Sequence, residues 1–334
     1  MKYYFPVILI MSLAAVRFAL VCVFSGVECK ETPILPEIPI LTKIRTASVE
    51  VVDRNFPSPH SELLLGMLIG LDRLDEVPQF SDNLRDTSTI HVVVVSGFNI
   101  ALVFGLITKL LGSEYKIKNI IIAQIFTLFY SLLSGFEPPV VRALVMGSIV
   151  AWGKYSGRLI DGLRVLFFAA SVMVVISPSY LSSVSFQLSF GASLGLILFS
   201  NLLSNIKLPE DLKSTLSAQI LVWPIISHYF GKVSLIGIVV NPLILWTVPV
   251  ATILGGIFLL LGFISPFLAT LFSIILYPFL DVFARLVSFF GSLKHISLDY
   301  KIGLITMLAY YLVVIACVLY FKKVIKQRNA VKKD

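Results

Sequence analysis

Charged residues and cysteines are scarce in this 334-residue chain. Charged side chains make up 14% of it and hydrophobic ones 57%, whereas an ordinary soluble domain has about 25% charged and roughly 45–50% apolar residues. The three cysteines and four histidines are scattered, without paired spacing. We therefore expect neither a disulfide framework, nor a bound metal, nor a cofactor.

Long apolar runs take up most of the chain instead, and the mean hydropathy is +0.93. A membrane-spanning helix needs about 20 such residues. The sequence predicts an all-α polytopic membrane protein with about ten transmembrane or re-entrant helices and a small extracytoplasmic segment. The expected crossings are 4–24, 90–111, 119–134, 138–155, 163–177, 184–200, 213–230, 234–261, 265–290 and 302–321.

These runs divide the chain into four parts. Residues 1–28 form an N-terminal anchor, 29–80 a short extracytoplasmic segment, 81–321 the membrane domain and 322–334 a basic tail. The first run is longer than the 7–15 apolar residues of a signal peptide, so we expect it to be retained rather than cleaved.

The extracytoplasmic segment has two recognisable patterns. TKIRTASVEVVDRNF (42–56) is typical of one or two short strands, and HSELLLGMLIGLDRLDE (60–76) of an amphipathic helix lying in the membrane interface.

Lysines and arginines predict the orientation. They lie in alternate loops, around Lys116, Arg158 and Lys207, and in the tail FKKVIKQRNAVKKD. Because basic residues collect in cytoplasmic loops, we expect both termini in the cytoplasm of a bacterial cell (inner or plasma membrane), which also accounts for the net charge of +8.

Polar residues interrupt several of the apolar runs. Such groups usually face the bundle interior or a water-filled path, and we expect them to line a route for a polar substrate. The candidates are His91, Ser96, Asn99, Arg142, Gln187, Ser189, Gln219 and Asn241.

Glycines and prolines in the same runs predict structural breaks. These are Gly97, Pro138, Pro139, Gly191, Pro224 and Pro242. With Pro242 and Pro249, the segment 234–261 is expected to be discontinuous or re-entrant, whereas Asp281 and Arg285 suggest that the second half of 265–290 lies along the interface.

Simpler interpretations exist for these features. Gly97 and His91 are compatible with a helix-packing notch and a structural histidine. Arg142 either reaches the interface or lines an outer vestibule. Pro224 is most simply a kink whose freed carbonyl has an internal partner.

A set of segments occurs in this order along the chain: LLLGMLIGLDR, LRDTSTIHVVVVSGFNIALV, SGFEPPVVRALVM, the long segment from GRLIDGLRV to FQLSFGASLGLI, AQILVWPIISHYFG and NPLILWTVPV. Together they resemble the membrane domain of the ComEC family of bacterial DNA-uptake channels. The resemblance covers about residues 60 to 260. It implies inward transport of single-stranded DNA during natural transformation, with membrane lipids, a cytoplasmic ATPase and an outer DNA-receptor protein as partners.

The chain also departs from the family. Its outer segment is at best a reduced form of the OB-like domain, and the family's HLLAISG-like pattern stands here as HVVVVSGFN. It has no HxHxDH motif of a metallo-β-lactamase-like domain, so no nuclease activity is expected.

Two other functions remain open. A transporter or flippase for a small polar or lipid-linked solute fits broken helices and polar midplane residues. An intramembrane hydrolase using His91 or His228 with Asp281 ranks third, because no nucleophile–base pair occurs at local spacing. We therefore do not expect the protein to be an enzyme.

Overall fold

The computed structural model describes residues 38–93, 95–112, 116–203, 207–234, 236–293 and 297–331. The expected N-terminal crossing 4–24 lies outside them. The described residues are almost entirely helical, and two three-residue strands, β1 (Lys232–Ser234) and β2 (Ser297–Asp299), pair antiparallel. The expectation of a helical membrane protein is therefore met in its coarse form.

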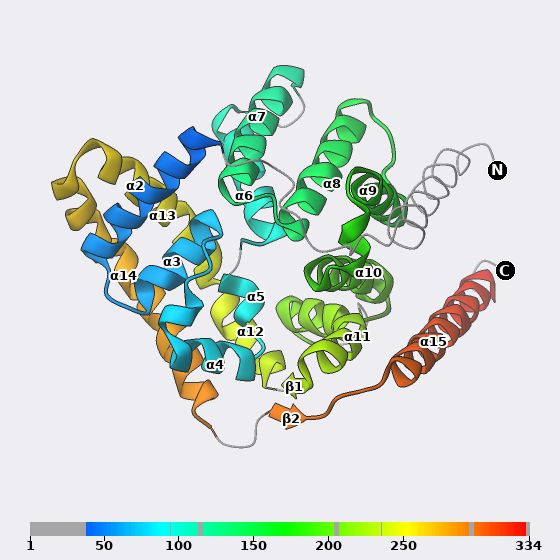
Figure 1. The fold of residues 1–334 in the computed structure, drawn as a ribbon. Helices are drawn as coiled ribbons and strands as arrows, with labels where there is room; N and C mark the ends of the chain where they lie inside the picture. The colour runs from blue at the N-terminus through cyan, green and yellow to red at the C-terminus, as the bar shows by residue number, and fades with distance from the viewer. Residues whose placement is uncertain are drawn as a thin grey trace.

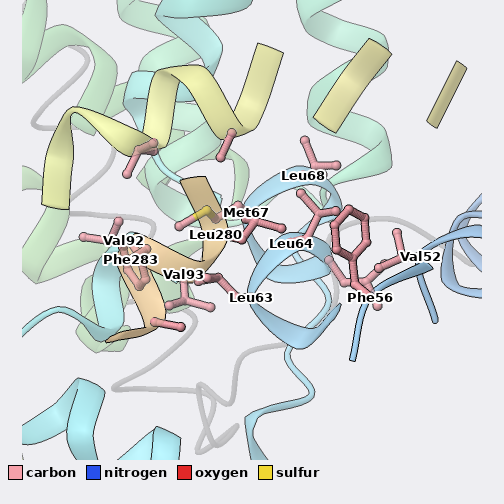
Figure 2. Packing of buried hydrophobic residues seen from close by; sticks show 14 of the residues in the cluster. Val52, Phe56, Leu63, Leu64, Met67, Leu68, Val92, Val93, Leu280 and Phe283 are labelled. Atoms are coloured by element: carbon pink, nitrogen blue, oxygen red, sulfur yellow. The ribbon is translucent and has the colours of Figure 1, made fainter. Parts of the chain in front are cut away.

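One half of the molecule is built around a fully buried helix. This helix, α3 (His60–Ile69), buries all ten of its residues, as expected for a helix whose stretch from Leu63 to Ile69 is apolar all round. It contacts α2 (Pro39–Asn55), α13 (Thr247–Ile264) and α14 (Pro266–Gly291). Figure 2 shows Leu63, Leu64 and Met67 from α3 among side chains from α2 and α14.

The outer segment differs from its prediction. The expected strands within 42–56 are wrong, because this stretch lies in α2, which begins with Pro39 in its first turn and contacts α13 and α14. The prediction of an interfacial amphipathic helix is also wrong for α3, whose surface is covered by packed helices. Its polar continuation is a separate 3₁₀ turn, η2 (Leu74–Glu76), followed by α4 (Pro78–Asp86), which packs on α14.

The other half contains a run of helices that follow one another in space (Figure 1). They are α6 (Gly97–Leu110), α7 (Ile117–Leu133), α8 (Pro138–Tyr155), α9 (Gly162–Ile176), α10 (Val184–Leu203) and α11 (Glu210–Phe230). The bounds lie close to the predicted crossings, and α8 begins at Pro138 because proline is favoured in a first helical turn.

Two predicted crossings are each divided into two helices. Residues 90–111 contain α5 (Ile90–Val93) and α6, and 234–261 contains α12 (Gly237–Leu245) and most of α13. The second division falls at Trp246 rather than at a proline, so Pro242 lies inside α12. By contrast, α14 continues through Pro278 as one helix of 26 residues.

Three segments within the described residues have the length and hydropathy to cross a membrane: Ile90–Leu110, Thr247–Ile264 and Pro266–Gly291. Shorter apolar helices accompany them. The protein is thus a helical membrane protein.

The last helix, α15 (Leu304–Val331), extends from β2 and contacts α11 (Figure 1). The hydroxyl of Tyr310 donates to the carbonyl of Ile220 at 2.9 Å, and that of Tyr311 to Leu221 at 2.7 Å. Pro224 has no N–H to offer Ile220, four residues earlier, so Tyr310 supplies the missing partner. Pro224 does not break α11, which is continuous.

Candidate functional site

The division between α5 and α6 is the centre of the candidate site. Helix α5 ends at Val93, Ser96 has an extended backbone (φ −99°, ψ 162°), and α6 begins at Gly97. The β-branched run before Ser96 and Gly97 lowers helix propensity locally. Non-helical backbone within a span is tolerated only where protein or a water-filled cavity surrounds it. Val95 is buried and Ser96 half-buried.

Arg142 of α8 lies directly beside this break. Its Nη2 atom is 3.0 Å from the position that a Cβ on Gly97 would occupy, where Pro139 O and Ala143 Cβ are nearly as close. Glycine at position 97 therefore lets α6 and α8 pack at this separation, and a larger residue would press on Arg142 and Ala143. The sequence indicated both residues but not that they meet.

Ser189 of α10 holds the guanidinium from another side. Arg142 donates from Nε to the hydroxyl of Ser189 at 2.8 Å, and its Nη1 lies 3.8 Å from the sulfur of Met146. The guanidinium carbon is 6.0 Å from the centre of the Phe190 ring. Among the described residues no carboxylate pairs with Arg142, although the side chain is half-buried.

Asn99 makes a structural contact, whereas the sequence suggested that it lines the path. It is 1% exposed and donates from Nδ2 to the carbonyl of Met67 at 3.0 Å. The hydroxyl of Tyr130 approaches the same carbonyl at 3.5 Å. Asn99 therefore fastens the first turn of α6 to the buried helix α3. Tyr130 and Met67 carried no sequence signal, because their roles depend on contacts distant in the chain.

A second cluster of polar residues lies at the other end of α5, where the chain enters this helix. A Cβ on Gly237 would lie 2.9 Å from Cβ of Ser88 and 3.6 Å from Nε2 of Gln219. His91 of α5, three residues after Ser88, is exposed although it lies within a predicted crossing. Ser88, Gly237 and Gln219 thus form one neighbourhood of the turn before α5 with α11 and α12.

Buried polar atoms without partners accompany this neighbourhood. Gln219 Oε1, Trp223 Nε1 and Asn241 Oδ1 have no hydrogen-bond partner among the described residues. Gln219 is 9% and Asn241 5% exposed. Because an unpaired buried polar group is costly, these atoms fit a part of the bundle that admits water or a polar solute. Trp223 was not among the predicted residues.

Gln187 and Gly191 lie apart from the two groups. Gln187 donates from Nε2 to the carbonyl of Leu181 at 2.9 Å, a local contact at the start of α10. The prediction of a break at Gly191 is wrong, because α10 is continuous there. A Cβ on Gly191 would lie 3.5 Å from Ile225, and Gly195 packs against Ser217, so this GxxxG pair lets α10 and α11 approach closely.

The groups proposed for hydrolysis do not come together. Asp281 accepts from Arg285 Nε at 2.7 Å and lies 3.4 Å from Nε2 of His60. His228 instead binds the carbonyl of Ile302 at 3.0 Å. The described residues contain no cluster of three or more His, Cys, Asp or Glu side chains suited to a metal ion.

Comparison with known proteins places this arrangement in a family. Residues 68–324 match the competence protein family. An uncharacterized protein of Aquifex aeolicus (strain VF5) is 30% identical over 241 residues, 72% of this chain and 55% of that protein. ComE operon protein 3 of Bacillus subtilis (strain 168) is 25% identical over 206 residues, 60% of this chain and 26% of that protein.

A third relative, the uncharacterized protein YcaI of Escherichia coli (strain K12), is 31% identical over 154 residues, 42% of this chain and 20% of the relative. The chain thus spans about half or less of the length of these curated relatives. No solved structure matches. Since the family match covers well over half of the sequence, the chain belongs to the competence protein family, whose ComEC-type members it was expected to resemble.

Proposed function

We propose that this protein forms a membrane channel that carries single-stranded DNA inward during natural transformation. Membership of the competence family supports a role in DNA uptake. The observation that carries the channel itself is the position of Arg142, a half-buried guanidinium beside a broken helix with no carboxylate partner among the described residues. Arginine binds phosphate through two parallel hydrogen bonds, so the phosphodiester backbone suits this group.

One aromatic ring lies near the guanidinium, and another belongs to the first turn of α6. Phe190 lies 6.0 Å from it, and Phe98, the neighbour of Gly97, is 53% exposed. Single-stranded DNA is bound without sequence preference by cations that follow the backbone and by aromatic rings on which bases stack. Arg142 with Phe98 provides both kinds of group within one stretch of the proposed path.

The unpartnered polar atoms extend the path beyond Arg142. Gln219 Oε1 and Asn241 Oδ1 offer hydrogen bonds to water or to base edges, and the exposed ring of His91 adds a third polar group. A translocating strand needs many exchangeable polar contacts rather than one tight site. Asn99 and Gln187 are assigned to structural contacts instead.

The proposal requires other components. The sequence has no G-x-x-x-x-G-K-[ST] nucleotide-binding motif, so a cytoplasmic ATPase and an outer DNA receptor are the expected partners. We propose a multi-pass location in the bacterial inner or plasma membrane, with both termini in the cytoplasm, and no catalytic activity of the chain itself.

DNA uptake in living cells tests the proposal. A strain lacking the gene is complemented with the wild type, Arg142→Gln or Arg142→Lys and supplied with labelled DNA, and the nuclease-protected label inside the cells is measured. We expect almost no uptake in the deletion strain. Arg142→Gln, which keeps hydrogen-bonding capacity but loses the charge, should lower uptake about tenfold or more, and Arg142→Lys less, because it keeps the charge without the planar fork.

Membrane insertion of each variant is verified by immunoblot of isolated membranes. Undiminished uptake in the deletion strain contradicts the channel. Uptake of a labelled small polar solute that persists when the other DNA-uptake components are deleted favours the transporter instead.

A further inference from the structure

A groove between α6 and α8 is not explained by the proposed DNA path. It encloses about 230 Å³ and is lined along one side by α8, from Ala143 to Lys154. At 1.5 Å per residue this stretch is about 16 Å long. Small side chains from both helices, together with Thr127 of α7, make up much of its wall: Ala101, Gly105, Ala143, Gly147, Ser148 and Ala151.

The glycines keep the groove open. A Cβ on Gly105 or on Gly147 would find no atom within 4 Å. Both glycines are exposed, so the groove opens on the outer surface of the helix bundle. This contrasts with Gly97, where the same two helices meet closely through Ala143. The two helices thus pack closely at Gly97 and leave open space at Gly105 and Gly147.

The size of the groove limits which ligands can bind in it. Pockets for drug-sized ligands have volumes of roughly 300–1,000 Å³, and this space is smaller and elongated. A single acyl chain fits a long, narrow space walled by apolar side chains, and it removes that apolar surface from contact with disordered lipid tails.

Charge is concentrated at one end only. Lys154 lines the groove near the last turn of α8. Trp152 and Tyr155 beside it are 39% and 45% exposed, and the Trp152 indole donates to Gln124 at 3.2 Å. Exposed Trp and Tyr side chains mark the level of lipid headgroups, and basic residues between helices at this level bind anionic headgroups.

We propose that the α6–α8 groove binds one phospholipid with an anionic headgroup. Its acyl chain lies along Gly147 and Gly105, and its phosphate contacts Lys154. The groove adjoins the Arg142 site at Ala143, but binding of a lipid there does not depend on the proposed transport of DNA.

Native mass spectrometry of the full-length protein with phosphatidylglycerol tests this site. The wild type should retain one phosphatidylglycerol that Gly147→Leu, which fills the groove, releases. Lys154→Gln should weaken retention about fivefold, as expected for one lysine–headgroup contact. The matched control is Gly256→Leu, since Gly256 on α13 also has open space around its Cβ position, and it should bind like the wild type. Should Gly147→Leu fail to fold, Gly105→Leu replaces it.

A phosphatidylglycerol with a photoreactive group on its acyl chain identifies the location. Labelled peptides should come from 97–110 and 143–154. Equal retention by the wild type and both groove-filling variants overturns the proposal, as does labelling confined to other helices or an equal loss in Gly256→Leu. Unchanged retention by Lys154→Gln overturns the headgroup assignment. Occupation of the groove by another protein segment would give peptide cross-links instead of lipid labelling and would also overturn it.

Discussion

Tyr310 donates its hydroxyl to the carbonyl of Ile220, the carbonyl that Pro224 leaves without a helical partner. Tyr310 and Ile220 are 90 positions apart in the sequence. A proline inside a span is thus accommodated by a side chain from the last helix, and α11 stays continuous.

This contact predicts a coupling between Tyr310 and Pro224. Tyr310→Phe should reduce the free energy of unfolding by about 0.5–1.5 kcal/mol. In a Pro224→Ala background the N–H of residue 224 is available to Ile220, so the same change should cost clearly less. Unfolding of the purified protein in detergent by a denaturing surfactant measures both effects. Tyr311→Phe is the control, because its partner Leu221 does not depend on Pro224, and equal coupling for both tyrosines would contradict the assignment.

Close packing at Gly97 predicts that a larger residue there lowers both stability and DNA uptake. Gly97→Ala places a Cβ at 3.0 Å from Arg142 Nη2 and 3.1 Å from Ala143 Cβ. We expect a loss of about 1–3 kcal/mol from overpacking and reduced DNA uptake because Arg142 is displaced. Gly105→Ala on the same helix meets no atom and should be neutral or slightly stabilising. Stability and uptake are measured on both variants, and identical behaviour would show that the contact at Gly97 is unimportant.

The ion pairs of Arg73, which lie outside the membrane-spanning segments, predict that the stability of the fold depends on pH. It donates to Glu76 at 2.7 Å and to Asp53 at 3.0 Å. The hydrogen bond from Arg73 lowers the pKa of Glu76, and these contacts raise the pKa of Arg73. A lowered carboxyl pKa stabilises the fold above the unfolded value, about 4.3 for Glu, and this stability is lost as the pH falls through the folded pKa.

The thermal midpoint of the wild type should therefore fall as the pH drops below about 4.3. The thermal midpoint of Arg73→Gln should fall less over that range. High salt should reduce the difference, since these side chains are partly exposed. An unchanged pH profile in Arg73→Gln would mean that the contact contributes nothing to stability.

Salt should weaken DNA binding only moderately. Each phosphate neutralised on a single strand contributes a slope of about −0.7 in log affinity against log salt. On the proposed outer side, Arg73 is bound to Asp53 and Glu76, and Arg85 lies 3.9 Å from Asp82, so these two cations are partly neutralised. Arg142→Gln should therefore reduce the slope by less than about one unit while lowering affinity. Fluorescence anisotropy with a labelled oligonucleotide measures this, and absence of binding by folded protein at low salt would count against the channel.

The positions of basic residues predict the orientation. Asp75→Cys should react with an impermeant thiol reagent in intact cells, and Arg158→Cys should react only after the membrane is opened. Both positions are exposed, so a difference in labelling reflects the side of the membrane. The reverse labelling pattern would invert the proposed topology.

Helix positions were largely predictable from the sequence. Pro138 gave the start of α8 because proline suits a first turn, and Pro242 with Pro249 indicated that 234–261 is divided. The exact point, Trp246, was not predictable. The strands expected in 42–56 failed because β-branched residues such as Val49 and Val52 pack equally well on a helix face that a neighbouring helix covers.

The site was predictable only in its parts. The polar character of Arg142 and Ser189 marked both as unusual in a span, but their hydrogen bond joins residues 47 positions apart. Likewise, Asn99 looked like a path residue, and only its contact with Met67 assigns it to packing. Distances between helices depend on the whole bundle, which local patterns do not encode.

The buried helix α3 imposes an order on biosynthesis. His60 at its start meets Asp281 of α14, 221 residues later in the chain. With only ten residues, α3 is too short to cross a bilayer alone. During translation it must therefore be sheltered at the membrane surface or by an insertion factor until α13 and α14 emerge. Loss of those two helices should expose α3 and direct the nascent protein to quality-control proteolysis.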